Sequence, residues 1–170
     1  VDMARLGWRT GIAAAAVVFV AMGMTALAEG VRIVEDRKLE PGGTLIIEAD
    51  AGSVDLKGGS GSGAHIVITS DYDGLKDNFD FKYEESAGTL RIIAKKKGAG
   101  AGGGGGWLSG WFGGSVHAPN FSIQVPEKTR LDIHTGGGHI EVASIRGDAG
   151  LHTSGGHVQV TDLTGALSIE

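Results

Sequence analysis

Cysteine is absent from this 170-residue chain, which excludes both a disulfide framework and a thiolate metal site. Basic residues are few as well. Lys and Arg number 15 against 20 Asp and Glu, and the one run of cations is 95–97. Because nucleic-acid binding needs clustered Lys and Arg to neutralise phosphates, the formal net charge of −5 disfavours nucleic acid as a partner.

Several catalytic motifs are also missing. The sequence has no Gly-x-Ser-x-Gly elbow of hydrolases, and no Lys-Ser/Thr follows the glycine run 102–106, as a phosphate-binding loop would need. The calcium-binding nonapeptide Gly-Gly-x-Gly-x-Asp does not occur. We therefore expect a protein that is not an enzyme and that needs no cofactor.

Residues 1–28 are typical of a secretory signal peptide. Arg5 and Arg9 precede the apolar stretch 12–24, and Ala26-Leu27-Ala28 forms a small-x-small cleavage site. The alternative is an uncleaved anchor, since 10–28 is uncharged and just long enough to span a membrane. Either interpretation predicts an exported protein in the periplasm, on the cell surface or outside the cell.

One pattern is written twice near the end of the chain. Residues 134–142 and 152–160 match at an offset of 18, and a third copy begins because Leu131, Ala149 and Leu167 align. Apolar residues alternate within each copy, which is the period of a β-strand, and glycines punctuate the copies. A short fixed period of this kind is typical of a β-solenoid.

The predicted fold class is therefore all-β, with a signal helix at 1–28, a lead-in at 29–43 and a single β-solenoid or β-roll of stacked 18-residue coils at 44–170. A degenerate copy of the repeat at 47–56 aligns with 133–142. Further strands are expected at 31–34, 64–70, 79–84, 89–94 and 120–125, and no helix beyond the signal segment. An antiparallel meander of similar hairpins is the alternative, and the shared register of the copies favours the solenoid.

Four histidines are candidate metal ligands. His134 aligns with His152, and His139 aligns with His157, so stacked coils would place each pair about 5 Å apart on the outer surface. Imidazoles gathered at one corner suit Zn²⁺ or Ni²⁺. The simpler interpretation is that they are solvent-facing residues copied with the repeat.

A Gly/Trp-rich insertion at 95–115 holds the second candidate site. Trp107, Leu108, Trp111 and Phe112 follow the three lysines, and aromatic side chains beside cations suit a membrane interface or a glycan. The alternative is a loop that covers the solenoid.

The last residues of the chain lie on a repeat strand without a polar cap. An open sheet edge invites pairing, so we expect either further coils beyond Glu170 or self-association through this edge.

The pattern Leu131-x-Ile133-x-Thr135, followed by Gly138-x-Ile140-x-Val142, resembles the bacterial β-strand-repeat family of putative adhesins, a domain of unknown function. The resemblance covers about residues 40–170 and implies a non-catalytic surface or scaffold protein with cell-surface or envelope partners. The alternatives are a metal- or glycan-binding module at the histidines or the Trp loop and, third, a glycan-active enzyme.

Overall fold

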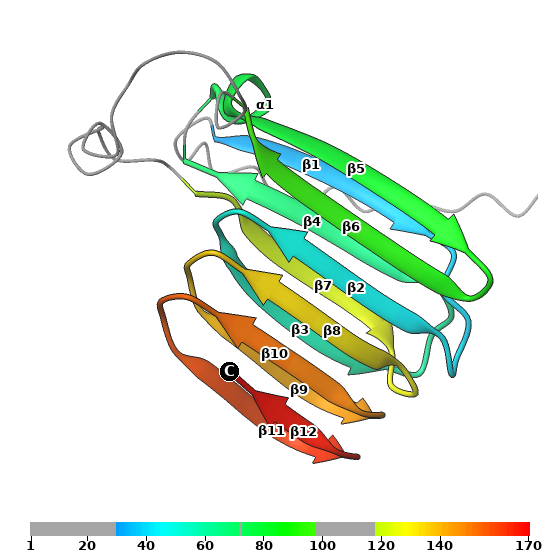
Figure 1. Ribbon diagram of the computed structural model, residues 1–170. Helices are drawn as coiled ribbons and strands as arrows, with labels where there is room; N and C mark the ends of the chain where they lie inside the picture. Colours follow the sequence, from blue (N-terminus) through cyan, green and yellow to red (C-terminus); the bar gives the residue numbers. More distant parts are fainter. Residues whose placement is uncertain (1–29, 72, 98–117) are drawn as a thin grey trace, which may run out of the picture.

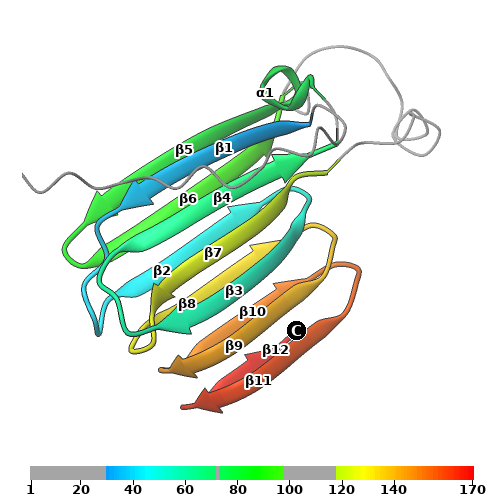
Figure 2. The same ribbon diagram turned by 180° about the vertical axis from the view of Figure 1, so that it is seen from behind.

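The computed structural model describes residues 30–71, 73–97 and 118–170. Within them two β-sheets lie face to face (Figures 1 and 2). Sheet A has the strand order β1-β4-β7-β3-β9-β11, and sheet B has the order β12-β10-β8-β2-β6-β5. The predicted signal segment, 1–28, lies outside the described residues.

The strands are short and most of them alternate between buried and exposed residues. Those of sheet A are β1 (Val31–Arg37), β3 (Ser53–Gly59), β4 (Ala64–Ser70), β7 (Asn120–Pro126), β9 (Ile140–Arg146) and β11 (Val158–Thr164). Those of sheet B are β2 (Thr44–Ala49), β5 (Phe79–Ser86), β6 (Thr89–Lys96), β8 (Arg130–Thr135), β10 (Ala149–Thr153) and β12 (Leu167–Ile169). Between β4 and β5 the chain makes one helical turn, α1 (Leu75–Asn78), where the sequence predicted no helix.

The core fills the space between the two sheets. Every second residue of a central strand points inward, and on β2 and β3 this places Leu45, Ile47 and Leu56 at 0 % exposure. Burying an aliphatic side chain in this way contributes about 1.5–3 kcal/mol. The alternation of apolar and polar residues in the sequence therefore decides which face of each strand meets the other sheet.

The 18-residue offset of the sequence is confirmed as a parallel strand register. Ile133 pairs with Leu151, and Leu151 pairs with Ile169. The degenerate copy at 47–56 is confirmed too, because Ile47 pairs with Ile133 in parallel. These four residues form one row across sheet B. We call each connected pair of strands, one from each sheet, a rung: β2–β3, β8–β9 and β10–β11.

A glycine corner joins the two strands of each rung. Gly138 has a φ of +121°, a backbone conformation that is unfavourable for residues with a side chain. A Cβ there would lie 2.4 Å from the carbonyl oxygen of Gly52 in the next rung. The backbone continues the ladder around this corner, since the Gly52 N–H donates to the Gly137 carbonyl. The glycines are thus needed because the corners of successive rungs touch.

The prediction of a single β-solenoid is wrong. Both sheets are mixed, because β1 pairs antiparallel with β4, β4 with β7, and β5 with β6. Rung β2–β3 also lies between β6–β7 and β8–β9, so neighbours in the stack are not neighbours in the chain. The repeat describes only the rungs β2–β3, β8–β9 and β10–β11, whereas pairing between segments distant in the sequence sets the order of the strands. The described part of the chain holds no helix with the length and apolar character needed to cross a membrane.

Candidate functional site

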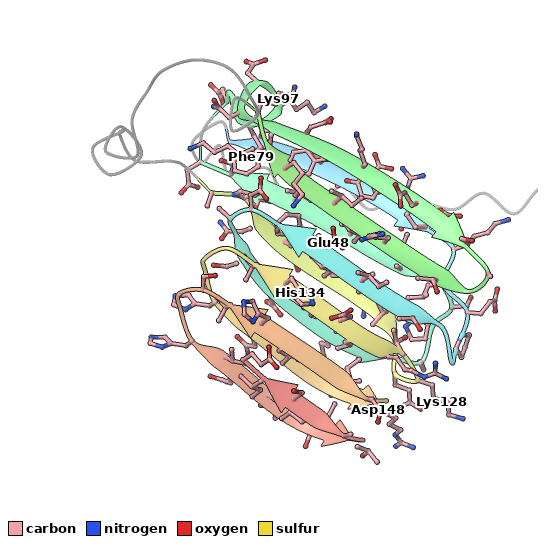
Figure 3. All side chains as sticks on the ribbon, in the orientation of Figure 1. Glu48, Phe79, Lys97, Lys128, His134 and Asp148 are labelled. Carbon is pink, nitrogen blue, oxygen red and sulfur yellow. The ribbon has the colours of Figure 1, made fainter. Side chains whose placement is uncertain are left out.

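The outer face of sheet B carries a straight row of polar side chains. Glu48 of β2 pairs with His134 of β8, and His134 pairs with His152 of β10. Glu170 follows β12 and completes the row beside His152, since its backbone carbonyl accepts from the Thr153 N–H. Figure 3 shows Glu48 and His134 on this face. Parallel pairing without a shift produces such rows, because equivalent residues of adjacent strands point the same way.

Carboxylates flank the two imidazoles of this row. The ring centroids of His134 and His152 lie 5.6 Å apart. Nε2 of His134 lies 2.8 Å from Oδ1 of Asp132, and Nδ1 of His152 lies 3.8 Å from Oε2 of Glu170. All four groups are largely exposed, so water screens these contacts and each adds little to stability. Of the two imidazoles, His134 has a hydrogen bond to its carboxylate, whereas His152 lies only within ion-pair distance of Glu170.

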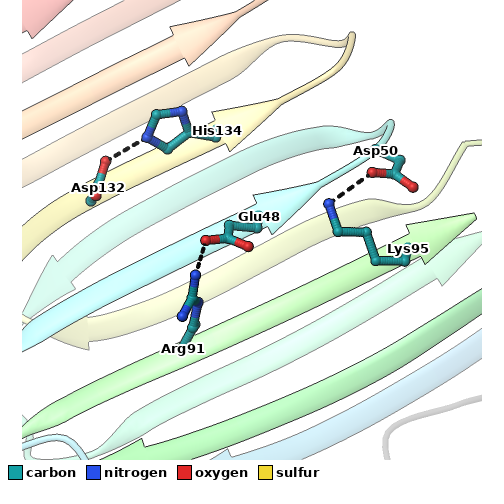
Figure 4. Close-up of polar contacts among 6 residues, drawn as sticks. All are labelled: Glu48, Asp50, Arg91, Lys95, Asp132 and His134. Atoms are coloured by element: carbon teal, nitrogen blue, oxygen red, sulfur yellow. Dashed lines mark hydrogen bonds and ion pairs between the residues drawn. The ribbon is translucent and has the colours of Figure 1, made fainter.

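Two further ion pairs hold the neighbouring side chains in place (Figure 4). The Arg91 guanidinium donates to Glu48, and Lys95 Nζ lies 3.0 Å from Oδ1 of Asp50. Burial raises the pKa of Asp50, but hydrogen bonds from the Lys96 N–H and from Lys95 outweigh it, so the pKa is lower than that of an ordinary aspartate. Asp50 is therefore a fixed negative charge at neutral pH.

The second pair of histidines lies across the glycine corner. The rings of His139 and His157 stack with centroids 4.9 Å apart and an interplanar angle of 15°. Nδ1 of His139 accepts a hydrogen bond from the His157 backbone N–H at 3.1 Å. One rung further, Ser53 Oγ accepts from the His139 N–H at 3.2 Å. This column therefore stabilises the corner by supplying acceptors to backbone donors.

A pocket of about 720 Å³ opens beside the first histidine pair. Its lining combines the row with the strand ends near the corner: Glu48, Asp50, Lys95, Lys96, His134 and His152 contribute to it. The lining offers both hydrogen-bond donors and acceptors, which suits a polar ligand more than an apolar one.

The register brings together each predicted histidine pair, but the four rings do not form one metal centre. Within residues 30–71, 73–97 and 118–170, no group of three His, Cys, Asp or Glu side chains is placed to hold a metal ion. Trp107, Leu108, Trp111 and Phe112, the other predicted contact residues, lie outside the described residues.

Sequence reasoning missed the carboxylates that flank the histidines. The signal was available, because aligning Ile47 with Ile133 also places Glu48 beside His134, and aligning Leu151 with Ile169 places Glu170 beside His152. It also missed His65, whose Nδ1 lies 2.7 Å from Oδ1 of Asp36. That pair lines a second pocket, of about 650 Å³. No repeat pointed to it, since β1 and β4 pair in antiparallel fashion.

Comparison with known proteins gives similarities of fold only. No protein-family model and no curated protein matches the chain. The solved structure of a putative cell adhesion protein from Clostridium sporogenes is 12 % identical, matches 82 % of this chain and 99 % of that one, and has a TM-score of 0.42. A putative adhesin from Bacteroides fragilis is 10 % identical over 82 % of this chain and 79 % of its own, with a TM-score of 0.34.

A putative lipid binding protein from Parabacteroides distasonis is 14 % identical over 82 % of this chain and 61 % of its own, with a TM-score of 0.44. At these identities and TM-scores the likeness does not indicate what this chain binds. The names of the Clostridium and Bacteroides proteins nevertheless match the family of putative adhesins that the sequence resembles.

Proposed function

We propose that this protein is a non-catalytic protein exported from a bacterial cell, which acts at the envelope or the cell surface as an adhesin or a scaffold. The observation that supports this proposal best is the row of side chains across sheet B, Glu48 to Glu170, set by the parallel register. Straight rows on a flat sheet present a regular surface to a large or extended ligand.

The polar contacts of this face also support a binding role. Glu48, Asp50 and Asp132 are each paired, with Arg91, Lys95 and His134 respectively. Side chains that are already held lose less conformational entropy when a partner docks. The face is thus prearranged for contact.

The two histidine pairs offer a matched test of this proposal. The labelled chain is applied to a glycan array. Replacing His134 and His152 by alanine changes the face of sheet B, whereas replacing His139 and His157 changes the same number of imidazoles at the corner. We expect the first double variant to lose binding at least tenfold and the second to retain it, a difference of about 1.4 kcal/mol or more. Equal binding by both variants, or no binding by the unaltered chain to any probe, would contradict the proposal.

A second candidate is a binding module for a small polar ligand or a metal ion, and the pocket of about 720 Å³ beside His134 favours it. Calorimetry with Zn²⁺ tests the metal version. A heat of Zn²⁺ binding that the unaltered chain shows and the His134→Ala/His152→Ala variant lacks would support a metal site. If the unaltered chain shows no heat of Zn²⁺ binding, the metal version is wrong.

A further inference from the structure

A pocket on sheet A lies apart from the row of side chains on sheet B. Strands β3 and β4 flank β7, so the connection between them, 60–63, crosses the end of β7 (Figure 2). This connection and a cross-strand row of three polar residues, Asp36, His65 and Gln124, line a pocket of about 650 Å³. The pocket has no part in the function proposed above.

Hydrogen bonds hold the connection at both ends. The Gly59 carbonyl accepts from the Glu127 N–H at 2.8 Å, and the Gly63 N–H donates to the Leu39 carbonyl at 2.9 Å. Between these two points the chain reads Ser-Gly-Ser, and residues 60–62 are exposed. A loop that is already held loses less conformational entropy when a ligand docks, so its two hydroxyls are prearranged for contact.

The polar row beside the loop supplies both kinds of hydrogen-bonding group. Nδ1 of His65 lies 2.7 Å from Oδ1 of Asp36. Because an ionised carboxylate only accepts hydrogen bonds, the proton of the neutral imidazole lies on Nδ1, and Nε2 is an acceptor. The side-chain amide of Gln124 donates and accepts, as the loop hydroxyls do. The pocket therefore presents donors and acceptors next to one another.

The charges of the lining disfavour an anionic ligand. Three carboxylates, Asp36, Glu40 and Glu85, contribute to the pocket, against the two cations Arg37 and Lys38. One of these cations is shared with a carboxylate, since Nη1 of Arg37 lies 4.0 Å from Oε1 of Glu85. A ligand that carries a negative charge would meet more repulsion than attraction here.

The lining also disfavours an apolar ligand and a metal ion. Its larger apolar residues, Leu39 and Val125, are each 2 % exposed, so they offer almost no surface to a lipid tail. In the part of the chain that the structure describes, no three His, Cys, Asp or Glu side chains gather to hold a metal. What the pocket suits is an uncharged ligand rich in hydrogen-bonding groups.

We propose that this pocket binds a neutral sugar, either alone or as one unit of a glycan. Each hydroxyl of a sugar ring both donates and accepts, and adjacent hydroxyls can engage a neighbouring donor and acceptor together. The imidazole Nε2 of His65 accepts from one hydroxyl, and the Gln124 amide bonds the next. The site is on sheet A and is independent of the row on sheet B, so it goes beyond the proposed function.

The experiment titrates the full isotope-labelled chain with glucose, galactose and mannose, up to about 100 mM. Nuclear magnetic resonance follows the backbone amides and the side-chain amide of Gln124. We expect at least one sugar to shift the signals of residues 60–65 and of Gln124 in a saturable manner. The three matched uronates carry a carboxylate in place of one CH₂OH group. They should bind about threefold more weakly or worse, because the lining holds an excess of carboxylates.

Two variants of the same strand provide the matched comparison. Gln124→Ala should weaken sugar binding about threefold to tenfold, the effect of losing one neutral hydrogen bond. Asn120→Ala removes another exposed amide of β7, at the opposite end of the strand and outside the pocket, and should leave binding unchanged. The dispersion of the amide signals shows that each variant is folded, and the shifts of the unaltered chain test the site without any variant.

Four results would overturn the proposal. They are saturable shifts confined to sheet B, equal losses in the two alanine variants, uronates that bind as tightly as the neutral sugars, and no saturable shift with any of the six sugars. None of them decides the proposed function, which the two histidine variants test on a glycan array.

Discussion

The backbone N–H of His157 donates a hydrogen bond to Nδ1 of His139, 3.1 Å away in the rung beneath it. A ring nitrogen accepts a hydrogen bond through its lone pair, so this contact needs Nδ1 of His139 without a proton. His139 is therefore part of the fold, because its side chain supplies an acceptor to a backbone donor at the glycine corner.

Removing this acceptor should destabilise the chain. We expect His139→Ala to lower the free energy of unfolding by about 0.5–1.5 kcal/mol, the net value of one hydrogen bond. His139→Ser should lose less, because Ser53 already accepts the equivalent bond one rung further, at 3.2 Å. Urea denaturation of the two variants measures the difference. Equal losses would mean that ring stacking, and not the acceptor, stabilises the corner.

Acid should weaken the contact between the ends of β2 and β6. The pKa of Asp50 lies below the ordinary value because the hydrogen bonds from Lys96 N–H and Lys95 outweigh burial, which acts in the opposite direction. A carboxylate whose folded pKa is lower than its unfolded pKa stabilises the fold fully at a pH above the unfolded pKa, about 3.9 for aspartate. This stabilisation is lost as the pH falls through the folded pKa.

The variant Asp50→Asn isolates this contribution. Its deficit in unfolding free energy relative to the unaltered chain should be constant from neutral pH to about pH 5 and shrink below about pH 4. Denaturation at a series of pH values checks this. A deficit that does not change with pH would show that the charge of Asp50 is not the cause.

The glycine corner should not tolerate a side chain where rungs touch. Gly138→Ala would place Cβ 2.4 Å from the Gly52 carbonyl oxygen, at a φ of +121°. We expect a loss of about 1–3 kcal/mol or more from backbone strain alone. Gly137→Ala is the control, since a Cβ there meets nothing within 4 Å. Thermal unfolding of both variants distinguishes strain at one position from a general cost of losing glycine.

Truncating a side chain at the centre of the apolar row through sheet B should strongly destabilise the fold. Ile133 lies between Ile47 and Leu151 and is 0 % exposed, so Ile133→Ala should cost about 2–5 kcal/mol by lost burial and by the cavity it leaves. Val34→Ala, on an exposed side chain of β1, should cost much less. Similar losses in chemical denaturation would contradict the assignment of this row to the core.

Much of the local structure could be predicted from the sequence. The strand expected at 64–70 matches β4 residue for residue, because alternation of apolar and polar residues is a property of the strand itself. The spacing of 18 also predicted that Ile133 pairs with Leu151, and the alignment of the copy at 47–56 predicted that Ile47 pairs with Ile133. The stacked histidine pairs follow from the same register, so this part of the candidate site could be predicted from the sequence.

The carboxylates of the site depended on a second step. Asp132 contacts His134 from the same strand, two residues away, and Glu48 belongs to a strand more than eighty residues earlier. Asp132 is therefore near His134 through the strand period alone, whereas Glu48 lies beside His134 only once β2 and β8 are placed next to one another. Reasoning from the last two copies alone cannot find Glu48.

By itself the sequence determined which residues point inward and which rung residues lie side by side, because both depend on a period that repeats along the chain. The tertiary structure alone decided the order of the rungs. It placed β2–β3 between β8–β9 and β6–β7, and it added antiparallel strands to both sheets at the β1/β5 end. The physical reason is that strands with the same alternation can pair equally well in many orders, and only burial of the whole apolar surface between two sheets selects one of them.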